Sequence, residues 1–309
     1  VGDEKQSIYI WRGAYPEAFK SILNKPNFKQ KFMGDNFRSN QQIQNYSNLL
    51  CDGTRDLYNP TDNIDNIVWL SSTDANWATK VLSNIDPNKS SALLRFSNKN
   101  AENGANKLTT NGLECVYIPQ IPIADITTET AWLYTAIAKY FILEKYSVYD
   151  VISEIPVEGN ENNKTVSTIK RLLNKIEKNI NDEPSFSSSV IALAKYLGYD
   201  TRPEHIDKLF ETICDSSYHV AFEPDKYKHI ATTFHSSKGL EFEQVIVFAE
   251  DYSLKDMPSI YNHYVAATRA KNKLIIVKLN NYYANCFQNN LQNIFSKSGH
   301  NIEDVVLFK

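Results

Sequence analysis

Apolar runs of strand length alternate with segments of helix length over most of this 309-residue chain. The runs are rich in Val, Ile and Leu, and several are apolar nearly throughout, as in parallel strands that are covered on both faces. This alternation predicts a doubly wound α/β domain, in which helices flank a parallel sheet. The expected strands are residues 66–70, 92–96, 113–118, 244–248 and 274–277. The expected helices of this domain are residues 39–50, 74–83, 98–107 and 259–270.

The middle of the chain follows a different pattern. From about residue 127 to residue 227, the strand-length runs give way to helix-length segments that are separated by polar loops. The expected helices here are residues 127–146, 165–180, 187–197 and 203–214. The simplest organisation is therefore one α/β domain that is interrupted by a helical insert.

The amino-acid composition and charge exclude several classes of protein. Hydrophobic residues make up 42% of the chain, which argues against overall disorder, and the formal net charge of −3 provides no global basic field for nucleic acid. Any DNA contact is therefore expected to be local. The four cysteines are far apart and form no zinc pattern with histidine, so no metal site is predicted. The sequence shows neither an export signal nor a membrane-spanning run, and a reduced cytoplasmic location without membrane partners is expected.

Four short blocks carry the most specific patterns in the chain. The first is residues 2–14 (Gly-Asp-Glu-Lys-Gln-Ser-Ile-Tyr-Ile-Trp-Arg-Gly-Ala), and the second is residues 36–39 (Asn-Phe-Arg-Ser). The third is residues 233–242 (Thr-Phe-His-Ser-Ser-Lys-Gly-Leu-Glu-Phe), and the fourth is residues 264–271 (Tyr-Val-Ala-Ala-Thr-Arg-Ala-Lys). In this order and composition, the blocks resemble the later motifs of superfamily-one DNA helicases of the UvrD/Rep/PcrA kind.

The resemblance implies a RecA-like fold and a division into domains. Residues 1–27 would be the tail of a first RecA-like domain with its linker, 28–126 and 228–309 the two parts of a second RecA-like domain, and 127–227 a helical accessory insert. The chain has no glycine-rich loop ending in Gly-Lys-Thr or Gly-Lys-Ser, with which the family binds nucleotide. Its first residues also resemble the exit of a strand that began earlier. We therefore expect the C-terminal portion of a motor, which is inactive without an N-terminal RecA-like domain.

Two arginines are the expected catalytic residues. In the resembling family, the arginines of the second and fourth blocks, here Arg38 and Arg269, contact the γ-phosphate of ATP across an interdomain cleft and neutralise charge in the transition state. Gln6 matches the glutamine that senses the terminal phosphate and positions the attacking water. The implied cofactor is ATP, with Mg²⁺ held mainly by the absent first domain. In isolation, either arginine would instead be interpreted as a surface charge that pairs with a carboxylate.

Four further residues match nucleotide contacts of the family. Phe37 matches the aromatic residue that stacks on adenine, and Glu241 matches the acidic residue that reaches the ribose hydroxyl. Lys238 and Gly239 would let the backbone turn tightly beside the phosphates. The structural alternatives are a core aromatic for Phe37 and a solvated strand-edge charge for Glu241.

The remaining matches concern nucleic acid. A protein that translocates without reading bases needs aromatic surfaces for stacking and polar contacts to the backbone. Trp11 matches a family aromatic that stacks on a single-stranded base, and Arg12 is a plausible partner for a phosphate or for an acidic residue of the missing domain. Thr233 and His235 match residues that contact the DNA backbone and couple it to the nucleotide cleft. The alternatives are a core position for Trp11 and a buried, hydrogen-bonded imidazole for His235.

The leading functional hypothesis is the C-terminal portion of an ATP-dependent DNA helicase, with single-stranded DNA and single-strand/double-strand junctions as partners. Its 3′ to 5′ polarity is implied by the resemblance alone. The main alternative is a non-catalytic, helicase-like module that docks DNA or proteins. An RNA helicase of the same superfamily is a third reading, and repair, recombination and plasmid or phage metabolism all stay open as pathways.

Overall fold

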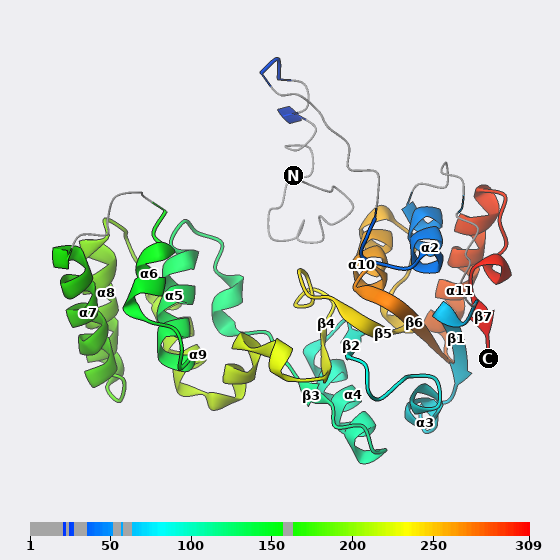
Figure 1. Cartoon of the computed structure of the whole chain (residues 1–309), viewed down its shortest axis with the longest axis horizontal. Coiled ribbons are helices and arrows are strands. Elements are labelled where there is room, and N and C mark those ends of the chain that lie inside the picture. Colours follow the sequence, from blue (N-terminus) through cyan, green and yellow to red (C-terminus); the bar gives the residue numbers. More distant parts are fainter. Residues whose placement is uncertain (1–20, 23–24, 28–35, 52–56, 58–63, 157–162) are drawn as a thin grey trace. The chain divides into compact units, whose positions relative to one another are not determined.

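The structure, a computed structural model, describes residues 21–22, 25–27, 36–51, 57, 64–156 and 163–309. The chain divides into two compact units (Figure 1). One is an α/β unit within Val1–Tyr117 and Tyr227–Lys309, and the other is a helical unit within Ile118–Lys226.

The α/β unit is built on a seven-stranded sheet, as far as the described residues go, in the order β3-β4-β2-β5-β6-β1-β7. Every pair of neighbouring strands is parallel. The strands are β1 (Ile67–Ser72), β2 (Ser91–Arg95), β3 (Val116–Tyr117), β4 (His229–Thr233), β5 (Phe242–Phe248), β6 (Ala270–Leu279) and β7 (Leu307–Phe308). The predicted α/β class is confirmed, and the parallel sheet is consistent with a RecA-like fold.

Helices cover both faces of the sheet (Figure 1). They are α2 (Gln41–Cys51), α3 (Trp77–Leu82), α4 (Asn98–Thr110), α10 (Met257–Ala267) and α11 (Tyr282–Lys297). Alternate residues of β1 show the two layers, because successive side chains of a strand point to opposite faces. Val68 lies in one hydrophobic cluster with Trp77 of α3, whereas the ring of Trp69 lies 5.9 Å from that of Phe287 on α11. This double cover explains why the central strands are apolar on both faces.

The structure differs from the sequence-based expectation in several elements, among them β4, the run at 113–118 and α11. Strand β4 was not predicted, because only Ile230 and Ala231 of His229–Thr233 are apolar. The run at 113–118 forms a strand only over Val116–Tyr117, at one edge of the sheet. Helix α11 was also not predicted; its exposed face carries several asparagines and glutamines, which weaken the apolar signal.

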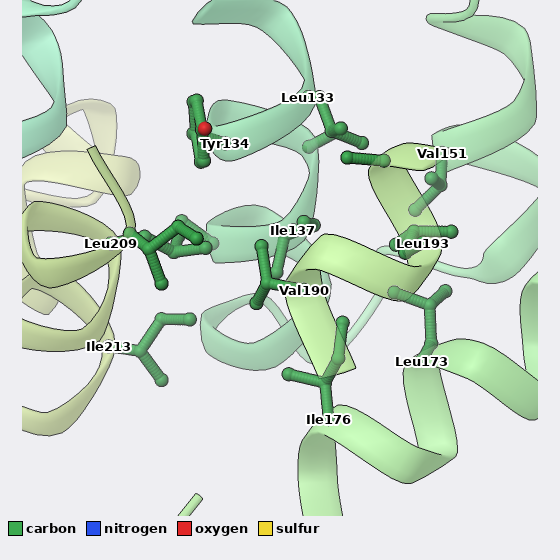
Figure 2. Close-up of a cluster of buried hydrophobic side chains, with 14 of the residues drawn as sticks. Leu133, Tyr134, Ile137, Val151, Leu173, Ile176, Val190, Leu193, Leu209 and Ile213 are labelled. Carbon is green, nitrogen blue, oxygen red and sulfur yellow. The ribbon is translucent and has the colours of Figure 1, made fainter. Parts of the chain in front are cut away.

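The helical unit has a core of its own. Its helices are α5 (Ala131–Ile142), α6 (Val148–Ser153), α7 (Asn163–Lys178), α8 (Glu183–Tyr196) and α9 (Pro203–Cys214). All five contribute buried side chains to the cluster in Figure 2, among them Leu133, Val151, Leu173, Leu193 and Leu209.

The boundary of this unit differs from the predicted insert. The unit begins at Ile118 rather than at residue 127, because Ile123 and Ile126 belong to the same core as the helices. The stretch before the first helix is therefore part of the helical unit and not of the sheet. Among the helices described in either unit, none combines the length and the apolar character needed to cross a membrane.

Candidate nucleotide and nucleic-acid site

The segment that carries Arg38 is fixed to the start of β6. The hydroxyl of Ser39 donates a hydrogen bond to the carbonyl oxygen of Ala270 at 2.7 Å, and the amide of Asn40 donates to the carbonyl oxygen of Lys271 at 2.9 Å. Both bonds join residues more than 200 positions apart in sequence. They place Arg38 beside the residue that follows Arg269, so the second and fourth sequence blocks meet at the amino end of β6.

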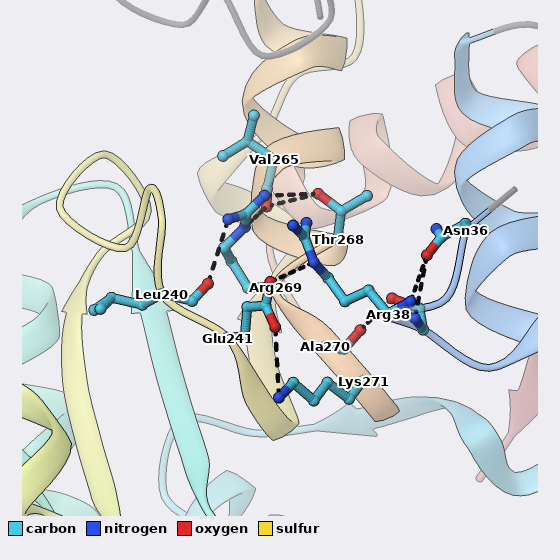
Figure 3. Close-up of polar contacts among 10 residues, drawn as sticks. Asn36, Arg38, Leu240, Glu241, Val265, Thr268, Arg269, Ala270 and Lys271 are labelled. Carbon is cyan, nitrogen blue, oxygen red and sulfur yellow. Dashed lines mark hydrogen bonds and ion pairs between the residues drawn. The ribbon is translucent and has the colours of Figure 1, made fainter. Parts of the chain in front are cut away.

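Glu241 lies between two cations at this edge. The Nε of Arg38 is 2.5 Å from one carboxylate oxygen of Glu241, and the Nζ of Lys271 is 3.4 Å from the other (Figure 3). The three side chains are each about a third exposed, so water screens the pairs and their contribution to stability is on the order of 0–1 kcal/mol. The ion pair between Arg38 and Glu241 is therefore weak. An anion of higher charge can displace the Glu241 carboxylate from Arg38.

Arg269 is held differently. Its side chain is buried, with only 2% of the residue exposed. Its Nε donates to the carbonyl oxygen of Val265 at 3.0 Å, one terminal nitrogen donates to that of Leu240 at 3.3 Å, and the other reaches the hydroxyl of Thr268 at 3.4 Å (Figure 3). Burial, and next the charge of Arg38, lower the pKa of Arg269 from its ordinary value, while Glu241 opposes the shift.

The two arginines thus lie near each other at the start of β6 (Figure 3). Ser39, next to Arg38, is hydrogen-bonded to Ala270, next to Arg269. Glu241, which pairs with Arg38, directly follows Leu240, whose carbonyl oxygen accepts from Arg269. They differ in access, because Arg38 faces solvent while Arg269 is enclosed by backbone carbonyls. Contact of either residue with a phosphate stays a prediction.

The other predicted nucleotide contacts lie on loops beside this cluster. Phe37 precedes Arg38 directly and is 94% exposed, so its ring is available for stacking rather than part of the core. Lys238 and Gly239 are exposed in the turn that leads to Glu241. Gly239 has a φ of +92°, a conformation that side chains other than glycine rarely adopt.

The predicted nucleic-acid residues of the third block lie at the end of β4. Thr233 is the last residue of this strand; its buried hydroxyl donates to the hydroxyl of Ser236 at 3.0 Å and accepts from the Ser236 amide at 3.2 Å. His235 is half-buried, with its ring centre 3.9 Å from that of Phe234. Thr233 therefore shapes the turn, whereas the imidazole of His235 lies nearer the surface.

The loop between β4 and β5 connects the two ends of the sheet. Thr233 pairs with Arg95, the last residue of β2, whereas Phe242 pairs with Ala270, the first residue of β6. Residues 234–241 therefore run back over a strand length of about 13 Å. One loop carries His235 at the carboxyl ends of the strands and Glu241 at their amino ends.

Sequence reasoning gave no role to an ion cluster beside this loop. Arg95 ends β2, and its guanidinium lies 2.6 Å from the carboxylate of Asp251 and 3.2 Å from that of Glu250. The guanidinium also lies 3.7 Å from the ring centre of Phe248. Burial raises the pKa of Glu250 to about 7, although the charge of Arg95 opposes the shift. The available signal was an arginine at the end of one apolar strand and two carboxylates shortly after another, but their proximity depends on the pairing of β2 with β5.

Three predicted site residues, Gln6, Trp11 and Arg12, lie outside the residues that the structure describes. Within the described ranges, no group of three or more His, Cys, Asp or Glu side chains is arranged to hold a metal ion.

Comparisons with known proteins point to the same segments. Residues 229–277 match the family model of the UvrD-like helicase C-terminal domain, which includes the third and fourth blocks. The chain is 35% identical over 295 residues to the Gabija protein GajB of Bacillus cereus (strain VD045). This match covers 92% of the chain and 58% of the relative, so the chain spans little more than half the length of that protein.

Proposed function

Because the chain carries the C-terminal domain of a UvrD-like helicase, we propose that it forms the second motor domain of an ATP-dependent enzyme that translocates on single-stranded DNA. A first RecA-like domain would bind most of the ATP and the Mg²⁺, and this chain would complete the site. By family resemblance, the direction is 3′ to 5′ and the substrates include single-strand/double-strand junctions.

The convergence of Arg38 and Arg269 carries the proposal. A polyphosphate needs several cations at one place, and the amino end of β6 supplies Arg38, Lys271 and Arg269 around the single carboxylate of Glu241. The exposed ring of Phe37 is adjacent in sequence and suits an adenine base. These residues fit ATP: Arg38 and Arg269 stabilise charge on the γ-phosphate, and Glu241 exchanges its contact with Arg38 for one to the ribose.

Coupling to DNA follows from the loop at 234–241. Its amino-terminal part carries His235 and its carboxyl-terminal part carries Glu241, on opposite ends of the parallel strands. Closure of the nucleotide cleft pulls on Arg38 and Glu241, and the loop transmits this displacement to Thr233 and His235 at the DNA. Gln6, Trp11 and Arg12 are assigned to the phosphate and DNA contacts of the same cycle by the resemblance.

The test is ATP hydrolysis by the full-length protein, with and without single-stranded DNA. Replacing an arginine that contacts the γ-phosphate lowers turnover by about 10³- to 10⁵-fold. We expect a loss of this order for Arg38→Ala, and a smaller one for Arg269→Lys, which keeps the charge but loses the planar hydrogen-bonding geometry. ATP binding should change less than turnover, because the arginines act mainly in the transition state.

Arg171→Ala is the matched control, because Arg171 is an exposed arginine on α7 of the helical unit. Its turnover should equal that of the wild type. Arg38→Ala is informative without concern for folding, because the Arg38 side chain is 39% exposed. Turnover of Arg38→Ala within a few-fold of wild type would refute the assignment.

The alternative of a non-catalytic docking module makes the opposite prediction. It requires a full-length protein that docks DNA or proteins without DNA-stimulated ATP hydrolysis, and in which Arg38→Ala leaves every measured property unchanged. Oligo-dT and oligo-U as activators of the ATPase separate the DNA translocase from an RNA helicase.

A further inference from the structure

Phe96 is an exposed aromatic residue at the carboxyl end of β2. It follows Arg95 directly, and 53% of the residue is accessible to solvent. A single exposed phenylalanine is common on a protein surface, so the neighbouring residues decide whether the ring of Phe96 has a role.

Hydrogen bonds hold the backbone at Phe96 to two neighbouring segments. Its amide donates a hydrogen bond to the carboxylate of Asp251 at 3.1 Å, and the same carboxylate binds the guanidinium of Arg95. The carbonyl oxygen of Arg95 accepts from the amide of Phe234 at 3.0 Å. Phe96 is thus fixed from both β4 and the segment after β5, so a ligand on its ring would not have to order this part of the chain.

Two other rings complete the surroundings. The ring centre of Phe96 lies 5.8 Å from that of Phe234 and 6.2 Å from that of His235, and the imidazole of His235 packs on Phe234 at 3.9 Å. Phe234 is fully buried, so it acts as the base on which the two outer rings rest. Phe96 and His235 therefore form an accessible pair of rings that comes from two separate strand ends.

We propose that Phe96 and His235 form a base-stacking site for single-stranded DNA, in which Phe96 supplies an aromatic face that one unpaired base covers. The proposal rests on the proposed function and adds Phe96 to its DNA contacts. Every base has an aromatic face, so such a site binds without regard to sequence. Duplex DNA is excluded, because its bases already stack on one another.

The test compares two DNA ligands and a set of variants of the full-length protein. The ligands are fluorescently labelled oligo-dT and an abasic oligonucleotide of equal length, and the readout is fluorescence anisotropy. Loss of one aromatic stacking contact typically costs roughly 5- to 150-fold in affinity. Phe96→Ala should show such a loss on oligo-dT and little or none on the abasic strand, because only the base contact is removed. Phe96→Leu, which keeps an apolar side chain without an aromatic face, should behave like Phe96→Ala.

Phe96→Trp tests whether another aromatic ring can replace that of Phe96. It should restore binding to oligo-dT, and the emission of the introduced indole should be quenched when a base stacks on it. Phe308→Ala is the matched control, because Phe308 is also an exposed phenylalanine of the α/β unit but lies on the edge strand β7.

The outcomes test the stacking site and the proposed function separately. Equal affinities of wild type and Phe96→Ala for oligo-dT would overturn the stacking site while leaving the translocase proposal intact. An equal loss on oligo-dT and on the abasic strand would also overturn it, since the ring would then act through the fold. Absence of any oligo-dT binding by the wild type, with or without a non-hydrolysable ATP analogue, would overturn the proposed function itself.

Discussion

Burial determines what each charged residue of the site is able to do. Arg38 and Arg269 occupy neighbouring positions, yet one faces solvent and the other donates to three internal acceptors. The buried guanidinium of Arg269 holds the end of α10 close to the loop before β5, because it donates hydrogen bonds to both Val265 and Leu240. Arg38 is therefore the more exposed charge of the pair, and Arg269 is the one that is fixed by internal hydrogen bonds.

Glu250 is expected to make stability depend on pH. Burial raises the pKa of its carboxyl from 4.5 to about 7, so the folded protein binds this proton more tightly than the unfolded chain. Stability is therefore lost as the pH rises between these two values, by up to about 3 kcal/mol in total. Urea unfolding at pH 5 and at pH 8 measures the effect.

Glu250→Gln cannot ionise and should lose this component of the pH dependence. The difference in unfolding free energy between Glu250→Gln and wild type should therefore grow in favour of the variant from pH 5 to pH 8. Glu303→Gln, at an exposed position, is the control for the substitution. A constant difference between Glu250→Gln and wild type at the two pH values would show that the carboxyl titrates normally.

Among the elements, the loop at 234–241 contributes most to the geometry of the candidate site, because it connects the carboxyl ends of the strands with their amino ends. Its path depends on β4, which lies between β3 and β2 and brings Thr233 level with Arg95. The loop returns to the amino end of β5 through the turn at Gly239. A short, partly polar strand and one glycine thus set the geometry of the third sequence block.

Gly239→Ala should be destabilising. The φ of +92° at this position is strained for any residue with a Cβ atom, although no neighbouring atom lies within 4 Å of an added Cβ. The cost is therefore backbone strain without a clash, about 1–2 kcal/mol. Chemical denaturation measures it, and Lys238→Ala at the adjacent position is the control. An unchanged unfolding midpoint would mean that the turn adopts another conformation at little cost.

At the level of the whole molecule, the chain contains two units with separate hydrophobic cores. The core of the helical unit draws on α5 to α9 and on the preceding Ile123 and Ile126. The chain enters this unit after β3 and leaves it before β4, two strands that are adjacent in the sheet. The insertion therefore begins and ends at neighbouring points of the α/β unit and does not interrupt the sheet.

The helical unit should fold when it is produced alone as residues 118–226. We expect a helical circular dichroism spectrum and a cooperative thermal transition, because its buried cluster is complete within these boundaries. Leu193→Ala should destabilise the isolated unit by about 2–5 kcal/mol, since Leu193 is fully buried. The exposed Lys195→Ala on the same helix is the control. A non-cooperative transition of the wild-type segment would contradict the assignment of an independent core.

The sequence alone determined the fold class and the composition of the four blocks. Apolar periodicity is a local property, so it located β1, β2, β5 and β6 and most helices, and the order of the blocks indicated the helicase family. It did not reveal β4, whose stability comes from strands on both sides rather than from its own five residues.

Tertiary structure decided which residues meet. Arg38 and Arg269 lie beside each other because the hydroxyl of Ser39 and the backbone amide of Asn40 donate hydrogen bonds to the start of β6. The ion cluster of Arg95, Asp251 and Glu250 and the ring pair of Phe96 and His235 likewise arise where neighbouring parallel strands end. Such contacts depend on strand order, which no local pattern encodes, and burial then distinguishes the accessible charge of Arg38 from the enclosed charge of Arg269.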